Sequence, residues 1–306
     1  MEKIAVVILN YLNYQDTIEC IESLKNDVYE NKEIIVVDNN STNNSWEILN
    51  EKYKDDNIYF LKSEKNLGFA KGNNIGIKYA RDVLKASFIL LVNNDTIFNE
   101  TKLLSEMINA YENDVAIIGP RIIEANGLEQ NPVPIEVSKK VVEERYNKLM
   151  NPNLKDRIKN SNMYSKAKNK KVFKIIKKIL VKQRENSYPS KEISPNICSK
   201  DLVLHGACMM LTKSYFEYYD KLFPETFLYY EENILTLLTK KVNLKKKFIN
   251  NVAIFHKEDM SSMISFGNSD KVKQKYELDS VKKCIEIFEL SYDEIIYKYF
   301  KSKKEH

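Results

Sequence analysis

The stretch SFILLVNNDT (87–96) decides the fold, because it joins a short, wholly apolar run to a polar end. A strand that is apolar at every position is buried on both faces, as in a parallel sheet covered by helices. Similar apolar runs recur between amphipathic stretches, at 4–9, 33–38, 58–61 and 115–119. This alternation predicts an α/β fold with a largely parallel sheet. We expect its helices near 15–25, 45–53, 69–84 and 100–112.

The composition of the sequence and its pattern of apolar runs change after residue 130. Residues 131–200 are rich in Lys and Asn, and the stretch 139–184 holds sixteen Lys or Arg against three acids. The α/β pattern resumes over 201–265, with LHGACMML (204–211) and FINNVAIFH (248–256) as expected strands. Residues 266–306 are Lys-rich and predicted to be helical. We therefore expect four parts, with boundaries at 1–130, 131–200, 201–265 and 266–306.

Composition narrows the class of protein. With 306 residues, 43% of them apolar, the chain can bury one substantial core. Its four cysteines are far apart and form no CxxC pair, so the sequence suggests neither a zinc site nor a disulfide framework. No stretch approaches the roughly 18 apolar residues of a membrane span, and we expect a cytoplasmic protein.

Polar residues follow the expected strands, where ligands bind in open α/β sheets. Asn10 ends the first run, Asp38 and Asn40 the second, and Asn94 and Asp95 the fourth. A carboxylate at a strand mouth suits Mg²⁺ or Mn²⁺, which bind through one or two carboxylates plus substrate phosphates. The same NNDT stretch also fits a strand-end turn in which Asp95 caps the next helix.

The stretch EKNLGFAKGNNIG (64–76) opens a helix with glycine and asparagine. Gly68, Gly72 and the asparagines, among them Asn66 and Asn74, would suit a backbone that approaches a diphosphate, and Lys71 would supply a counter-charge. Glycine at a helix start also serves packing alone. No GxGxxG or GxxxxGK[ST] motif follows a strand, which argues against a dinucleotide enzyme or a P-loop phosphotransferase.

Two further features offer acid–base or ligand groups. In FLYYEEN (227–233), Glu231 and Glu232 begin a helix, where one carboxylate could remove a proton from an acceptor hydroxyl. The helix dipole also favours acids in a first turn without any catalytic role. His256 ends a predicted strand and could ligate a metal or bind a phosphate, although a lone strand-end histidine is usually structural.

Taken together, seven motifs in chain order resemble those of the family 2 glycosyltransferases, inverting enzymes with the GT-A fold. The resemblance is greatest to the rhamnosyltransferase-like bacterial branch, and it covers about 1–125 and 200–260. The motifs are VVILNYLN, VVDNNSTNNS, NLGFAKGNN, LLVNNDT, GACMMLTKSYFE, FLYYEEN and His256.

The resemblance implies a metal-dependent hexosyltransferase that uses Mn²⁺ or Mg²⁺. The implied metal ligands are Asp95 and His256, and the implied base is Glu232 or its neighbour Glu231. The implied donor side comprises Asn10, Asp38, Asn40, Asn66, Gly68, Lys71, Asn74 and Asn94. On this basis 1–130 binds the nucleotide sugar, 131–200 is a basic helical insertion, 201–265 binds the acceptor and 266–306 is a helical extension.

The implied substrates are a dTDP- or UDP-linked sugar, with dTDP-rhamnose leading, and a glycan or lipid-linked saccharide acceptor. The implied process is synthesis of a bacterial capsular or surface polysaccharide. The chain departs from the family pattern at Asn93, which replaces a first acid, and at Ile234, which replaces an acid after the base. These departures leave a second interpretation, a catalytically silent protein that binds nucleotide sugars or polysaccharide.

The basic insertion allows two interpretations. Residues 172–181 would form a helix with one apolar and one lysine face, which fits a membrane-surface helix or an ordinary surface helix. In the first case 139–184 would contact the inner face of the plasma membrane. No nucleic-acid motif accompanies the basic charge, so we expect no nucleic-acid partner. The C-terminal helices are interpreted as an appendage or a homodimer contact.

Overall fold

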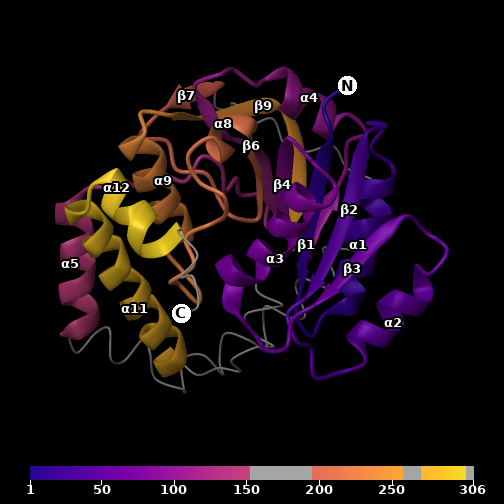
Figure 1. The fold of residues 1–306 in the computed structure, drawn as a ribbon, viewed down its shortest axis with the longest axis horizontal. Coiled ribbons are helices and arrows are strands. Elements are labelled where there is room, and N and C mark those ends of the chain that lie inside the picture. The colour runs from indigo at the N-terminus through magenta and orange to yellow at the C-terminus, as the bar shows by residue number, and fades with distance from the viewer. Residues whose placement is uncertain (152–194, 258–269, 301–306) are drawn as a thin grey trace.

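The computed structural model describes residues 1–151, 195–257 and 270–300, which form a mixed sheet flanked by helices (Figure 1). The strands of this part of the chain are β1 (Ile4–Asn10), β2 (Lys32–Asp38), β3 (Ile58–Lys62), β4 (Phe88–Asn93), β5 (Thr96–Phe98), β6 (Val115–Glu124), β7 (Ile197–Ser199), β8 (Cys208–Leu211) and β9 (Lys245–His256). Its helices are α1 (Tyr14–Lys25), α2 (Ser45–Lys52), α3 (Gly68–Asp82), α4 (Leu103–Asn109), α5 (Lys139–Met150), α8 (Lys213–Phe216), α9 (Glu231–Lys241), α11 (Asp270–Glu289), α12 (Tyr292–Ile295) and the π-helical turn η1 (Ile296–Phe300).

The sheet runs in the order β3-β2-β1-β4-β8-β6-β9-β5, with β7 paired to β9. Strands β1 to β4 are parallel, and their register sets Asn10 beside Asp38 and Leu9 beside Asn93. Strand β8 is antiparallel to both neighbours, so β6 and β9 return to the original direction. The carboxyl ends of β1, β2, β4, β6 and β9 therefore share one edge with the residues that lead into β8.

Alternate residues of the central strands fill two cores on opposite faces of the sheet. Ile4 and Val6 of β1 belong to a core with residues of α1, α2 and α4. Ala5 and Val7 belong to the other core, which α3, α9 and α11 complete. All four side chains are fully buried, and burying a large aliphatic side chain is worth about 1.5–3 kcal/mol. The continuous apolar runs in the sequence are thus explained by a sheet that helices cover on both faces.

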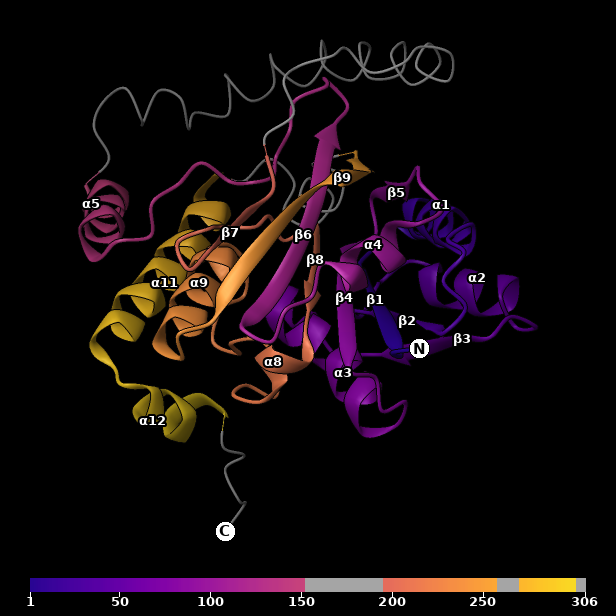
Figure 2. The same cartoon turned by 90° about the horizontal axis from the view of Figure 1, so that it is seen from above.

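The C-terminal helices complete the second core. Figure 2 shows α11 beside α9 and α5, on the far side of β6 and β9 from α1 and α2. Val281, Cys284 and Ile287 of α11 are fully buried. Arg145 Nε of α5 donates to Glu277 Oε1 of α11 at 2.7 Å. These helices are therefore part of the core, and a dimer through them would have to use their outward faces.

The predicted α/β fold with its parallel strands is confirmed, whereas several bounds differ. The strand expected over 204–211 is only Cys208–Leu211, and the helix expected over 100–112 is only Leu103–Asn109. The three-residue strands β5 and β7 were not expected, since so few residues show no period. The basic helix expected over 172–181 lies outside the described residues. Over the described ranges, no helix is both long and apolar enough to cross a bilayer.

Candidate active site

A buried polar network occupies the edge where β1 and β2 end. Asn10 Nδ2 donates to Asp38 Oδ2 at 2.8 Å and to Ser41 Oγ at 3.2 Å. Ser41 N donates to Asp38 Oδ1 at 2.8 Å, and Asp38 is 1% exposed. A carboxylate has about four lone-pair positions, so these bonds orient Asp38 and leave acceptor capacity. That capacity suits the N–H and O–H groups of a nucleoside.

The residues after Asp38 tie β2 to the start of α3. Asn39 Nδ2 donates to Asn66 Oδ1 at 3.0 Å and to Gly68 O at 3.1 Å, while Asn39 Oδ1 accepts from Leu67 N at 2.9 Å. Asn40 has a φ of 63°, a left-handed conformation that Asn adopts more readily than most residues. The loop before α3 is therefore fixed by asparagine side chains rather than left free.

The predicted donor residues on α3 do not all face the same way. Lys71 is exposed in the first turns of the helix, where a side chain can reach a bound anion. Asn74 instead pairs with the backbone of Leu222, donating to its carbonyl at 3.0 Å and accepting from its N–H at 2.8 Å. Asn74 thus fastens α3 to the segment before α9, apart from the strand ends.

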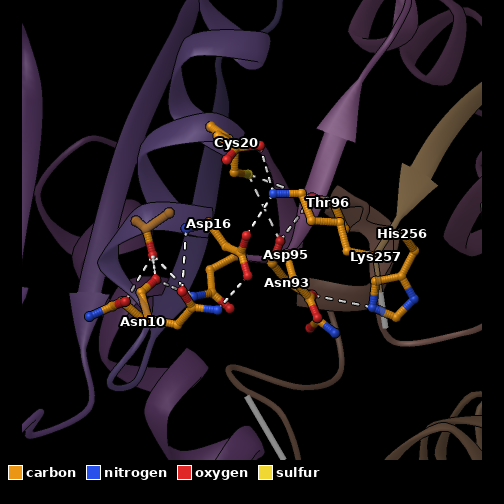
Figure 3. A network of polar contacts seen from close by, with 12 residues as sticks. Asn10, Asp16, Cys20, Asn93, Asp95, Thr96, His256 and Lys257 are labelled. Atoms are coloured by element: carbon orange, nitrogen blue, oxygen red, sulfur yellow. Dashed lines mark hydrogen bonds and ion pairs between the residues drawn. The ribbon is translucent and has the colours of Figure 1, made fainter. Parts of the chain in front are cut away.

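The turn after β4 brings a carboxylate to an imidazole from β9. Asp95 Oδ1 lies 3.2 Å from His256 Nε2, and both side chains are almost fully buried. Figure 3 shows the two side chains facing each other. His256 Nδ1 lies 2.8 Å from Gln130 Oε1, so both ring nitrogens of His256 are engaged. A proton on Nδ1 would bond to that oxygen and leave the Nε2 lone pair directed at Asp95.

This pair has the chemistry of a partial divalent-cation site. Ligands of Mg²⁺ lie about 2.1 Å from the ion, so two adjacent octahedral ligands are about 3 Å apart. The 3.2 Å separation of Asp95 and His256 matches that spacing. Within the described ranges, no third His, Cys, Asp or Glu joins them in a metal-binding group. Diphosphate and water oxygens would have to complete the coordination, as is usual for Mg²⁺ at phosphate-binding sites.

A partly buried lysine braces this turn against α1. Lys257 Nζ donates to Asp16 Oδ1 at 2.6 Å and to Glu19 Oε2 at 2.7 Å, and Lys257 N donates to Asp95 O at 3.0 Å (Figure 3). Burial alone would lower the pKa of Lys257, but the two carboxylates raise it above its ordinary value. Asn94 Nδ2 adds a bond of 3.1 Å to Asn13 O. The turn that carries Asp95 is therefore held on both sides.

The first turn of α9 presents two carboxylates in different environments. Glu232 is partly exposed, and its Oε1 accepts from Gly206 N at 3.0 Å. Glu231 is buried, its Oε1 has no hydrogen-bond partner among the described residues, and burial together with the Glu232 charge raises the pKa of Glu231 to about 8. At neutral pH Glu231 is mostly protonated, so Glu232 is the member of the pair suited to accept a proton.

The backbone before these carboxylates is strained. Tyr229 and Tyr230 have φ values of 73° and 66°, and each left-handed non-glycine residue costs roughly 1–2 kcal/mol. Phe227 holds the segment at its start, because its carbonyl accepts from Phe69 N at 2.8 Å and its ring stacks on Tyr276 at a centroid distance of 4.4 Å. The FLYYEEN and NLGFAKGNN motifs, far apart in sequence, therefore pack against each other.

His205 is a site residue that the sequence did not single out. Its ring centroid lies 5.6 Å from that of His256, and the next residue is Gly206, which binds Glu232. Burial lowers the pKa of His205, and the nearby Glu232 charge opposes that shift. His205 immediately precedes the Gly-Ala pair of the predicted strand, and that position was the only sequence signal.

The geometry sorts the predicted residues into groups. Asn10 and Asp38 lie at one end of a polar network and Asp95 and His256 at the other, linked through Thr17 and Asn94. Glu231 and Glu232 lie at the start of α9. Gln130, Ser41 and Lys257 were missed, because their roles depend on partners distant in sequence. Lys257 and Asp16, for example, are 241 residues apart.

Comparison with known proteins identifies the family. A model of "Glycosyl transferase family 2" matches residues 5–173, more than half of the chain. The chain is 25% identical over 232 residues to a low-salt glycan biosynthesis hexosyltransferase, Agl10, of Haloferax volcanii, a match that covers 76% of this chain and 60% of that protein. It is 33% identical over 108 residues to the Escherichia coli protein "UDP-Glc:alpha-D-GlcNAc-diphosphoundecaprenol beta-1,3-glucosyltransferase WfaP", covering 35% of this chain and 41% of the relative. The chain thus spans about 60% or less of the length of these relatives.

Solved structures give the same fold. Staphylococcus aureus TarS in complex with UDP superposes with a TM-score of 0.52 at 16% identity, covering 96% of this chain and 68% of that one. The mannosyltransferase PcManGT of Pyrobaculum calidifontis, in complex with GDP-Man and Mn²⁺, gives a TM-score of 0.51 at 11% identity, covering 89% and 60%. The expected GT-A type of α/β fold is confirmed.

Proposed function

Since this chain belongs to glycosyl transferase family 2, we propose that it transfers a hexose from a nucleoside-diphosphate donor to an acceptor hydroxyl with inversion. One observation carries the proposal. The Asp95–His256 pair and the Glu232 carboxylate lie at the same sheet edge, joined through His205 and Gly206. A carboxylate that could hold a donor-bound cation, beside a partly exposed carboxylate that could act as a base, supports sugar transfer.

The donor side uses the strand ends. Asp38, oriented by Asn10 and Ser41, would accept hydrogen bonds from the nucleoside. Asp95 and His256 would hold Mn²⁺ or Mg²⁺, and the bound cation would neutralise charge on the departing diphosphate. Lys71, exposed near the start of α3, would add a positive charge on the diphosphate side.

The acceptor side uses the first turn of α9. Glu232 would take the proton of the acceptor hydroxyl while that oxygen forms its bond to the anomeric carbon. The bond from the anomeric carbon to the diphosphate breaks in the same step, and the nucleoside diphosphate leaves with the bonding electrons. Because the nucleophile enters opposite the leaving group, the configuration at the anomeric carbon is inverted. The Gly206 N–H holds the carboxylate in place throughout.

The substrates follow from resemblance and from the relatives. The motifs NNDT and NLGFAKGNN favour dTDP-rhamnose, and the relative that acts with UDP-Glc keeps UDP-hexoses as candidates. That relative's acceptor is a diphosphoundecaprenol-linked saccharide, so we propose a lipid-linked saccharide acceptor in surface polysaccharide synthesis. Such an acceptor would place the protein at the cytoplasmic face of the membrane. Residues 1–130 would bind the donor and 201–265 the acceptor.

A nucleotide panel tests the proposal. UDP, dTDP, GDP and CMP are added with and without Mn²⁺, and the melting temperature is measured, since a ligand bound only by the native state raises stability. Release of nucleoside diphosphate is then followed with UDP-glucose or dTDP-rhamnose and a lipid-linked saccharide. We expect metal-dependent stabilisation by UDP or dTDP, followed by release. Stabilisation without release from any donor would favour a silent binding protein, and stabilisation by none of the nucleotides would overturn the proposal.

A further inference from the structure

His205 lies between the Asp95–His256 pair and the Glu232 carboxylate. It directly precedes Gly206, whose N–H binds the Glu232 carboxylate, and its ring packs against that of His256 with an interplanar angle of 60°. Burial lowers the pKa of His205, and the nearby charges of Glu232, Glu124 and Asp95 oppose that shift. A group in this position is close to the place where donor and acceptor must meet.

Two hydrogen bonds fix the orientation of His205. Its backbone N donates to Asn131 Oδ1 at 2.7 Å, and its Nδ1 accepts from Ala207 N at 3.1 Å. A backbone N–H can only donate, so Nδ1 must be the unprotonated nitrogen of the ring. The proton of the neutral ring is therefore on Nε2.

The Nε2–H group is available to a ligand. Over the described residues, no protein atom accepts from this nitrogen, and the residue is partly exposed. His256 differs, because Asp95 and Gln130 engage both of its ring nitrogens. Of the two histidines, His205 is thus the one with an oriented donor and no acceptor in the part of the protein that the structure describes.

We propose that His205 is a further catalytic residue, whose Nε2–H donates to an oxygen of the donor's sugar-diphosphate unit. The inference rests on the proposed function and adds a contact to the same site. A fixed N–H dipole stabilises negative charge that develops as the bond to the diphosphate breaks, and it needs no reorganisation during the reaction. It contributes to kcat if its bond strengthens in the transition state.

Three substitutions of His205 distinguish the role of its Nε2–H from that of its Nδ1. His205→Asn can keep an acceptor near Nδ1 but has no donor at the Nε2 position, His205→Gln can reach that position with an N–H, and His205→Ala removes both groups. We expect kcat to fall by about 10- to 100-fold in the Asn and Ala variants, as for loss of a transition-state hydrogen bond. The Gln variant should stay close to the wild-type kcat. Melting temperatures are measured for all three variants.

A second measurement needs no turnover. Nitrogen-15 NMR of the histidine-labelled full chain, assigned with the His205→Gln variant, should show an Nε2–H tautomer for His205. Its Nε2 signal should shift when UDP-glucose or dTDP-rhamnose is added with Mg²⁺.

Three results would overturn the inference: a proton on Nδ1, a wild-type kcat in His205→Asn, or equal losses in all three variants together with lowered melting temperatures. Failure of the proposed function is separate. In that case the wild-type chain would release no nucleoside diphosphate, while the tautomer and the donor-dependent shift would still be measured.

Discussion

Asp95 Oδ1 lies 3.2 Å from His256 Nε2, and this contact joins the end of the parallel half of the sheet to the end of β9. The register of β5 and β9 sets Thr96 directly opposite His256, so hydrogen bonds of the sheet itself hold the pair. A site built on paired strands is held more precisely than one built on free loops. The geometry of the candidate metal site is therefore a property of the fold.

Removing the Asp95 charge should abolish metal-dependent donor binding. Asp95→Asn keeps the shape of the side chain and loses the anionic ligand, so we expect the Kd for Mn²⁺ to rise at least about tenfold. The stabilisation that Mn²⁺ adds to UDP or dTDP binding should disappear from melting curves. Asp201→Asn is the matched control, because Asp201 pairs with Lys240 on the surface. Equal Mn²⁺ affinity in both variants would exclude Asp95 as a ligand.

Two glycines with positive φ should respond differently to alanine. Gly68 and Gly127 have φ values of 74° and 81°, so alanine costs roughly 1–2 kcal/mol at either position. A Cβ at Gly68 would also lie 2.1 Å from Phe227 O, whereas one at Gly127 would meet no described residue within 4 Å. Urea denaturation should show Gly68→Ala to be the less stable variant by at least about 2 kcal/mol. Equal losses of stability would mean that the close approach to Phe227 is relieved at little cost.

The buried Glu231 should give the protein a pH-dependent stability that Glu231→Gln lacks. The pKa of Glu231 is raised from 4.5 to about 8 by burial and by Glu232, so the folded state holds a proton that the unfolded state releases. The stabilisation of the folded state by this proton is complete below pH 4.5 and is lost as the pH rises toward 8. Relative to the variant, the wild type should lose on the order of 3–5 kcal/mol across this window.

Denaturant midpoints at a series of pH values measure this difference. Parallel curves for the wild type and Glu231→Gln would contradict a protonated Glu231.

Helix α11 should position the acceptor base through the strained segment. Ser280 Oγ donates to Leu228 O at 2.8 Å, next to the left-handed Tyr229 and Tyr230. Ser280→Ala should lower kcat by about 3- to 10-fold, the value of one net hydrogen bond, with donor Kd unchanged. Ser105→Ala is a matched control, since Ser105 Oγ bonds the carbonyl of Lys102 within its own turn. A kcat equal to that of the control would show that α11 only supports the fold.

Much of the fold could be predicted because its sheet is covered on both faces. Runs such as IAVVIL and FILLV can be interpreted without knowing their partners, since every position except the partly buried Leu9 is buried. The short β5 could not be predicted, because its pairing with β9 depends on residues about 160 positions further along the chain. The C-terminal helices showed no sequence sign that their apolar faces complete the core beside α3.

Candidate site residues could be predicted where they lie at the end of a strand, and less well elsewhere. Asp38 and Asp95 follow buried strands, which is a local signal. Asn74 belongs to the same glycine-rich stretch as Asn66, yet its amide binds Leu222, a choice that only the tertiary packing determines. For His205 the only local signal is its position before the Gly-Ala pair, since its importance comes from the contacts of Gly206 and His256.

The most direct test of the account is sugar transfer by Glu232→Gln, with Glu225→Gln as the control on an exposed glutamate of the preceding segment. The variant amide can still accept the Gly206 N–H but cannot take a proton. We predict that Glu232→Gln lowers kcat by at least about 100-fold, as for loss of a general base, with unchanged affinity for the nucleotide sugar and wild-type kcat in the control. Transfer by Glu232→Gln at the wild-type rate would contradict the assignment of Glu232 as the base.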